Sequence, residues 1–395
     1  MKTTHFKTGL TLLRGVAIRE LHRLVSRPLY LLCMVAAPLF SALFLLTLMR
    51  DGLPEQLPAA VVDLDHTPAS RNFIRQLNAL SLVDIAAQPD NFSQARAAMQ
   101  RGEIYGILVI PEDFEAKATA GRRPEITFYT HNAYYIPAAL LYKSFRTMSV
   151  LASGAIVQQT LLAHGATSRE ITPRLQPVVI DMHPLNNPWL NYSLYLNNTF
   201  IPGILQLLIL LVTVFSIGTE LKQATSREWL AASHDSLVLA LAGKLLPQTL
   251  LFFVVGLLCQ ALLYGYSHFP LQNGLWPMLS AMLLLVVATQ SCAVIMMSIA
   301  PSLRIGLSMA GLFGIMSISL TGFSFPVPAM YPPFRLLTHI FPLRHYFLIY
   351  ADQALNGLPL YYSRWHYLAL QFYVLAALPL LPRLKRALRR QLYIP

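Results

Sequence analysis

The residue patterns that carry enzymatic chemistry are sparse in this sequence of 395 residues. A phosphate-binding loop needs GxxxxGK followed by Ser or Thr, so that backbone N–H groups surround the phosphates. Gly243-Lys244-Leu245 lacks both the upstream glycine and the hydroxyl residue, and the sequence contains neither GxSxG nor HExxH. We therefore expect no enzymatic activity from the chain itself, and no nucleotide, cofactor or metal ion bound by it.

Asp63, Asp65 and His66 form a cluster of groups that could bind a metal ion or exchange protons. They follow a short apolar segment at 59–62 and precede Thr67 and Pro68. Polar residues at such a strand-to-helix turn usually bond to the backbone and cap the helix. We interpret the cluster as turn and cap chemistry. The three cysteines lie in apolar segments and form no CxxC or zinc-type spacing, so we expect no disulfide or zinc framework.

The composition indicates that lipid solvates much of the chain. Hydrophobic residues make up 55% of the sequence and charged residues 12%, against roughly 25% charged residues in soluble proteins. The apolar residues are gathered in blocks long enough to cross a bilayer. We expect an α-helical polytopic membrane protein with six transmembrane helices. The expected spans are 29–49, 199–218, 237–264, 276–300, 304–322 and 365–381.

The net charge of +12 is concentrated at the two ends of the chain. Residues 1–28 and 383–395 are basic and flank apolar spans, which is typical of cytoplasmic segments and does not indicate nucleic-acid binding. Within the leader, Leu13, Val16, Leu21, Leu24 and Val25 lie near one helical face, while the arginines crowd toward the other. We expect 1–28 to form an amphipathic helix on the membrane surface or against protein. We also expect span 29–49 to be a retained anchor rather than a cleaved signal peptide.

Residues 50–197 carry charges of both signs in near balance and have the pattern of an α/β domain. Strands are predicted at 59–62, 82–86, 104–110, 125–129 and 178–180, and a long helix at 136–164. Long domains cross the membrane regardless of charge. We therefore expect an extracytoplasmic α/β domain inserted between the first two spans.

Loop charges fix the expected topology of the remaining region, 198–382. Lys222 and Arg227 place the loop 219–236 in the cytoplasm, and the loop 265–275, without Lys or Arg, is expected outside. Prolines and charges interrupt the apolar segment 323–350, which suits re-entrant helices, although an external loop remains an alternative. Lys244 is expected to extend to the membrane interface. We find no ionisable group near the middle of a span, which argues against a proton-driven carrier.

Five segments in this order and spacing resemble the type-2 ABC exporter permeases of bacteria, in the branch with a large periplasmic domain between spans 1 and 2. The segments are LPAAVVDLDHTPASRNF (57–73), GEIYGILVIPEDFEAKATAGRRPEITFY (102–129), IGTELKQATSREWLAAS (217–233), AGKLLPQTL (242–250) and TGFSFPVPAMYPPFRLLTHIFPLRHYF (321–347). In that family the loop after span 2 docks on the ATPase subunit. The resemblance implies that Glu220, Arg227, Glu228 and Trp229 lie on or beside this coupling surface. Here Gly218-Thr219 precedes Arg227-Glu228, whereas the family often has the reverse order.

The resemblance also implies partners and a location. We expect an ABC ATPase subunit that binds the ATP and magnesium, and a second permease subunit, identical or different. An adaptor protein and an outer-membrane channel are further partners that the periplasmic domain could serve. The expected location is the inner membrane, with both termini in the cytoplasm. Alternatives are a secondary transporter or channel, a membrane-anchored sensor, and a membrane enzyme. The first would need buried ionisable groups or inverted repeats.

Overall fold

The computed structural model divides the chain into two compact units, which are Met1–Gly52 with Pro184–Pro395, and Leu53–His183. Each unit has its own buried core and is described by itself. The described residues are 2–122, 124–165, 167, 170–171, 175, 183, 185–188 and 190–391. Side chains are described from residue 11 onward. The strand predicted at 178–180 lies outside this set.

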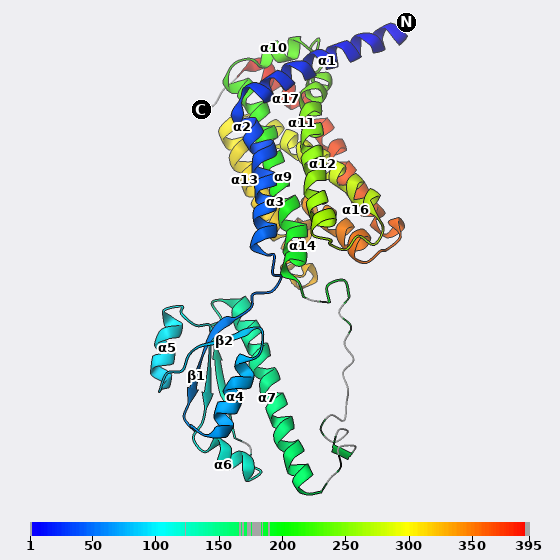
Figure 1. Ribbon diagram of the computed structural model, residues 1–395. Coiled ribbons are helices and arrows are strands. Elements are labelled where there is room, and N and C mark those ends of the chain that lie inside the picture. The colour runs from blue at the N-terminus through cyan, green and yellow to red at the C-terminus, as the bar shows by residue number, and fades with distance from the viewer. Residues whose placement is uncertain are drawn as a thin grey trace. The chain divides into compact units, whose positions relative to one another are not determined.

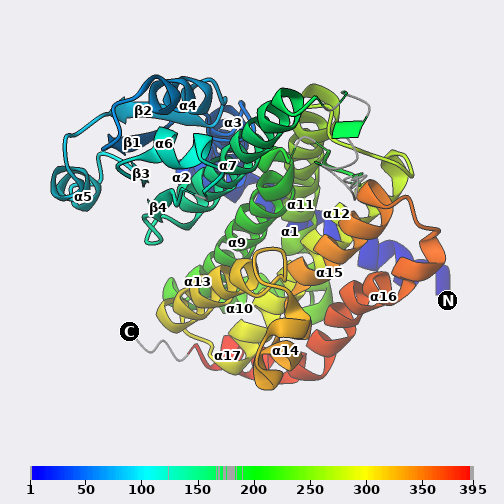
Figure 2. The same cartoon turned by 90° about the horizontal axis from the view of Figure 1, so that it is seen from below.

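The first unit is a helical bundle (Figures 1 and 2). In chain order its α-helices and π-helical turns, the latter labelled η, are α1 Lys2–Ser26, α2 Pro28–Leu31, η1 Leu32–Ala36, α3 Ala37–Leu48, α9 Tyr192–Lys222, α10 Ser226–Ala231, α11 Leu237–Gln260, η2 Ala261–Tyr266, α12 Leu275–Ile299, α13 Leu303–Ser319, α14 Pro332–Leu337, α15 Pro342–Ile349, η5 Tyr350–Leu355, α16 Leu360–Ala377 and α17 Leu381–Arg390. The 3-10 turns Val327–Ala329, Thr338–Ile340 and Leu378–Leu380 link the later helices. The bundle is thus mostly helical, as expected from the sequence.

Five helical segments in the described part of the chain are long and apolar enough to cross a membrane, and a sixth apolar helix is shorter. The long segments are Pro28–Leu48, Tyr192–Lys222, Leu237–Tyr266, Leu275–Ile299 and Leu360–Arg390, and the shorter helix is Leu303–Ser319. The first segment contains a π-helical turn just before Pro38, which has no backbone N–H to continue the regular pattern. These segments support a polytopic membrane protein.

Helix α9 occupies the centre of the bundle, with α13, α12 and α3 packed around it. Its contact with α13 depends on glycine. A Cβ on Gly314 would lie 2.5 Å from the Leu207 side chain, and a Cβ on Gly306 2.9 Å from that of Val214. Gly306 and Gly314 thus let two helices of the chain approach closely, whereas a Cβ on Gly311 would meet nothing within 4 Å.

The proline-broken segment after α13 forms short helices rather than an extended loop. Helix α15 packs into the bundle through Leu343, Tyr346 and Ile349, all buried. Helix α14, in contrast, has no buried residue. The segment therefore combines one buried and one exposed helix joined by a 3-10 turn.

The second unit contains a four-stranded sheet in the order β2-β1-β3-β4. Strand β1 pairs in parallel with β2 and β3, and β4 is antiparallel to β3. Helices α4 and α7 cover one face of the sheet and α5 covers the other. The element bounds are β1 Leu57–Asp63, α4 Pro68–Asn78, β2 Val83–Ala87, α5 Phe92–Gln100, β3 Gly106–Ile110, α6 Phe114–Thr119, β4 Thr127–Thr130 and α7 Tyr135–Ala163.

The polar cluster after β1 has the predicted turn role. The Asp63 carboxylate accepts hydrogen bonds from the backbone N–H groups of Asp65 and His66. The Asp65 carboxylate accepts bonds from the N–H groups of Phe114 and Glu115 at the start of α6, at 2.8 and 3.1 Å. Among the described residues, no group of three or more His, Cys, Asp or Glu side chains lies close enough together to hold a metal ion.

Candidate functional site

The loop between α9 and α11, residues 223–236, is held against the bundle by buried side chains. It contains the short helix α10. Trp229 is fully buried, and its indole Nε1–H donates to the Ala240 carbonyl at 3.2 Å. The Ser226 hydroxyl, also buried, donates to the Leu388 carbonyl on α17 at 2.7 Å. A six-residue helix cannot hold its own shape in water, so these tertiary contacts fix it.

The four residues expected at the coupling surface are divided between the two faces of this loop. Arg227 and Glu228 are exposed, while Glu220 and Trp229 have no exposed surface. Only Arg227 and Glu228 can therefore present side chains to another protein. Glu220 and Trp229 lie beside that surface and support it from within.

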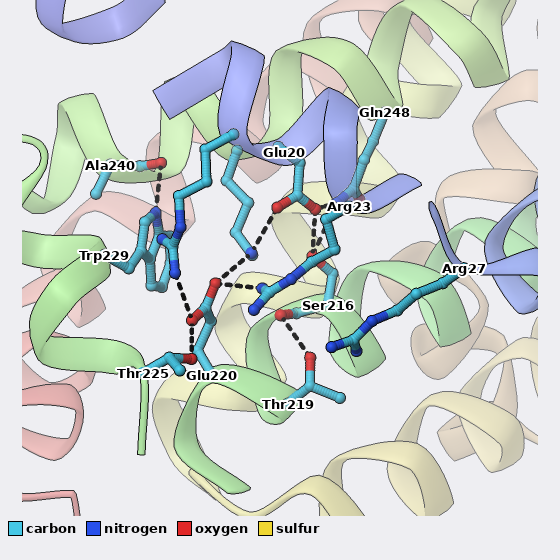
Figure 3. Close-up of polar contacts among 12 residues, drawn as sticks. Glu20, Arg23, Arg27, Ser216, Thr219, Glu220, Thr225, Trp229, Ala240 and Gln248 are labelled. Carbon is cyan, nitrogen blue, oxygen red and sulfur yellow. Dashed lines mark hydrogen bonds and ion pairs between the residues drawn. The ribbon is translucent and has the colours of Figure 1, made fainter. Parts of the chain in front are cut away.

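Glu220 lies in a buried ionic cluster that joins three helices (Figure 3). The Lys244 ammonium on α11 bonds to Glu20 of α1 at 2.8 Å and to Glu220 of α9 at 2.9 Å. Arg23 of α1 also pairs with Glu220, and Arg19 lies 3.4 Å from the same carboxylate. We call these five residues the ionic cluster. Its charges nearly balance, as burial requires.

Neutral side chains complete the cluster. Gln248 donates to Glu20 at 2.8 Å and to the Ser216 hydroxyl at 2.8 Å, and Ser216 donates to Glu20 at 3.0 Å. The Thr225 hydroxyl, in the α9–α11 loop, donates to Glu220. The cluster is therefore bonded directly to the loop as well as to α1, α9 and α11.

The expectation that Lys244 extends to the membrane interface is wrong. Its side chain is 1% exposed, and its ammonium lies 4.9 Å from the centre of the Trp229 ring. Two carboxylates and an aromatic face pair with this ammonium and offset the cost of removing it from water. The spans thus do contain buried ionisable groups, so their supposed absence no longer argues against a secondary transporter.

The side of α1 that packs on the bundle includes a charged residue that the sequence did not indicate. Val16 and Leu24 are buried, while Leu21 and Val25 are 53% and 65% exposed. The acidic Glu20 lies on the buried face, where it pairs with Lys244. The side of α1 that faces the bundle is thus partly ionic.

Helix α17 closes the site from the C-terminal end. Arg389 and Lys385 both pair with Asp235 in the α9–α11 loop. The hydrogen bonds from Arg389, and then from Lys385, hold the pKa of the Asp235 carboxyl below its usual value. Leu384 and Leu388 are fully buried beneath. The basic segment that the sequence indicated as a tail from 383 is therefore helical as far as Arg390 and docked on the loop.

This arrangement joins α1, α9 and α11 to the α9–α11 loop through ion pairs and hydrogen bonds. Arg227 and Glu228 are exposed on that same loop. The roles of Glu20, Arg23 and Gln248 were not predicted from the sequence. One signal was present: Glu20 is the only acid in the otherwise basic leader.

Comparison with known proteins gives two matches. A family model described as "ABC-2 family transporter protein" matches residues 28–381, most of the chain. A similar curated protein is the linearmycin resistance permease protein LnrN of Bacillus subtilis (strain 168), 32% identical over 111 residues. That alignment covers 28% of this chain and 28% of the relative, well under two thirds of its length.

Proposed function

Since the chain belongs to the ABC-2 family of transporter proteins and is a membrane permease, we propose that it exports a substrate with energy from a separate ATPase subunit. The observation that carries this proposal is the site at the α9–α11 loop. An exposed pair of opposite charges, Arg227 and Glu228, stands on a loop that is bonded to three helices through the ionic cluster.

We propose that the ATPase binds at Arg227 and Glu228. Closure of the ATPase on ATP would then push the loop, and the ionic cluster would carry that displacement to α1, α9 and α11 together. Packed helices respond to such a push by a rigid-body shift rather than by gradual deformation. A second permease subunit would complete the pathway, and ATP and magnesium would stay on the ATPase.

The proposed topology has six spans, with α13 as the short fifth one. Both termini and the α9–α11 loop would face the cytoplasm, and Leu53–His183 would lie outside the inner membrane. Support comes from the charge distribution, since Arg227 donates to the Arg389 carbonyl on the basic helix α17 and Lys222 ends α9 beside the same loop. An adaptor and an outer-membrane channel fit a unit of this size and belong to the same proposal.

The linearmycin resistance that the relative's name prints supports efflux as the direction of transport. We propose efflux as the class of transport here and leave the substrate's chemistry open. A secondary transporter remains the competing function, because Lys244 and Glu220 are buried ionisable groups. Transport that requires ATP hydrolysis would distinguish the proposed exporter from a secondary transporter.

The test is ATP hydrolysis by the chain and by its complex. We expect the chain purified alone to hydrolyse no ATP, and the complex isolated from native membranes in mild detergent to hydrolyse it. Arg227→Glu/Glu228→Lys should abolish recovery of the ATPase while the permease remains folded. The matched control is Lys222→Glu, a charge reversal at an exposed residue just before the loop. Recovery of the ATPase with the double variant at the wild-type level would contradict the proposal.

A further inference from the structure

A second basic feature lies at the same end of the bundle, in a cavity that the proposed coupling does not use. The cavity has a volume of about 530 Å³ and is formed where α12 ends, α13 begins and α17 passes. Arg383, Arg386 and Arg390 line one side of it, and Ile299, Ala300, Pro301, Ser302, Ile305 and Ala387 line the rest. No acidic residue is among these lining residues.

The positive charge in this cavity is left largely unneutralised within the described residues. Arg383 donates to the Ile299 carbonyl at 2.9 Å, and Arg386 makes a long 3.4 Å bond to the Pro382 carbonyl. Neither Arg386 nor Arg390 forms an ion pair in the part of the chain that is described. The other basic side chains of α17 behave differently, because Lys385 and Arg389 both pair with Asp235. The helix thus has one neutralised basic face and one open basic face.

The floor of the cavity is apolar and continues onto exposed apolar surface. Ile299 is 46% exposed and Ile305 is 47% exposed, at the facing ends of two apolar helices. Guanidinium groups bind phosphate through paired N–H donors, which makes arginine well suited to a phosphate group. An anion with apolar chains attached would satisfy the arginines and cover the isoleucines at once.

We propose that this cavity binds the phosphate headgroup of an acidic membrane lipid, with the acyl chains lying along Ile299 and Ile305. Basic pockets between helices at the inner membrane surface are suited to such headgroups. The inference rests on the proposed placement of α17 at a membrane surface. A free phosphate would share the arginines but would make no use of the apolar floor.

The experiment titrates the full-length chain, purified in detergent without any ATPase, and counts bound lipid by native mass spectrometry. The probes are dioleoyl phosphatidylglycerol, dioleoyl phosphatidylcholine with the same tails, and inorganic phosphate. We expect phosphatidylglycerol to bind roughly tenfold or more tightly than phosphatidylcholine. Millimolar inorganic phosphate should leave the lipid bound. Displacement of the lipid by inorganic phosphate would overturn the lipid assignment in favour of a free-phosphate site.

Variants on one helix make the comparison specific. Arg386→Gln/Arg390→Gln should weaken phosphatidylglycerol binding roughly ten- to thirtyfold, since each arginine near an anionic surface contributes about a factor of five or more. Lys385→Gln/Arg389→Gln removes the same charge from the other face and should change binding less than about threefold. Equal losses in the two double variants would overturn the proposal.

The single variant Arg390→Gln separates lost lipid binding from misfolding, because the Arg390 side chain makes no hydrogen bond or ion pair within the described part of the chain. It should still weaken lipid binding roughly fivefold, and unchanged binding would count against the site. Because no ATPase is present in this measurement, its failure leaves the test of Arg227 and Glu228 intact.

Discussion

At the scale of single residues, the position of Lys244 explains how a charged side chain can be buried among apolar helices. An isolated ammonium there would be strongly unfavourable, but two carboxylates lie within 3 Å of it. Buried ion pairs add little net stability compared with apolar packing, yet removing one partner leaves the others uncompensated. The cluster therefore makes the contact between α1, α9 and α11 specific.

Replacing Lys244 by Met is expected to destabilise the chain by about 3–5 kcal/mol, because Glu20 and Glu220 would stay buried without their shared cation. The measurement is thermal or denaturant unfolding of the detergent-purified protein. Lys222→Met serves as the control, since Lys222 is exposed at the end of α9, and should change stability by less than about 0.5 kcal/mol.

The pairing itself can be tested by removing both charges. In Glu20→Gln/Lys244→Met, Glu220 keeps Arg23 and Arg19, so more than half of the lost stability should return. Purely additive losses from the two substitutions would show that Glu20 and Lys244 are not coupled.

The cluster could not be derived from the sequence, although two of its members were noticed there. Glu20 and Lys244 are 224 positions apart, and Glu20 and Ser216 are 196 apart. Local patterns carry no information on pairings at such distances. Lys244 was expected at the membrane interface because it lies early in an apolar span. Its partner Glu20, which keeps it buried instead, lies on α1, outside the expected spans.

At the scale of elements, α1 can approach α11 only because residue 243 is glycine. A Cβ there would lie 2.7 Å from the Val16 Cβ and 3.1 Å from the Leu13 carbonyl oxygen. Val16 is β-branched and cannot rotate away easily. This approach sets the distance from Glu20 to Lys244, so the helix contact and the ionic cluster depend on one another.

Gly243→Ala should therefore cost about 1–3 kcal/mol of stability, despite the better helix propensity of alanine. Gly311→Ala is the matched control in another apolar helix, because nothing lies within 4 Å of its added Cβ. That control should be neutral or stabilising by up to about 1 kcal/mol. Differential scanning fluorimetry of both variants is sufficient, and a Gly243→Ala protein as stable as the control would refute the close approach.

The positions of helices and strands were easier to predict than which side of a helix is buried. The apolar runs located most of the long helices closely, but α9 begins seven residues before the predicted span at 199 and α16 five residues before the one at 365. The predicted strands at 59–62, 82–86, 104–110 and 125–129 overlap β1 to β4. The burial of Glu20 on α1 was not predicted, because a hydrophobic pattern cannot show that an ion pair occupies the buried side of that helix. The short helix α6 was missed, since Asp65 stabilises its start from a distant turn.

At the scale of the whole molecule, the two units have separate cores. The core of Leu53–His183 is built by the sheet with α4, α5 and α7, and Phe145 is a fully buried aromatic side chain in it. A mixed sheet with helices packed on both faces is a complete layer arrangement around a core. The unit therefore has what a domain needs to fold without the bundle.

A fragment of residues 53–165 is expected to fold alone and to unfold cooperatively, as followed by circular dichroism. Phe145→Ala should destabilise it by about 3–5 kcal/mol, because the ring is fully buried. Val150→Ala, at a position 65% exposed on the same helix, should change stability by less than about 0.5 kcal/mol. A fragment without a cooperative transition would show that the unit needs the bundle.

The proposed coupling depends most on the side of the membrane that Arg227 faces, because an ATPase can bind the α9–α11 loop only from the cytoplasm. The direct measurement is labelling of Arg227→Cys by a membrane-impermeant maleimide, with Cys33, Cys259 and Cys292 replaced by alanine. Thr119→Cys, exposed on the other unit, reports the opposite side. We predict that Thr119→Cys reacts in intact spheroplasts and that Arg227→Cys reacts only in inverted vesicles. Labelling of Arg227→Cys in intact spheroplasts would contradict the account.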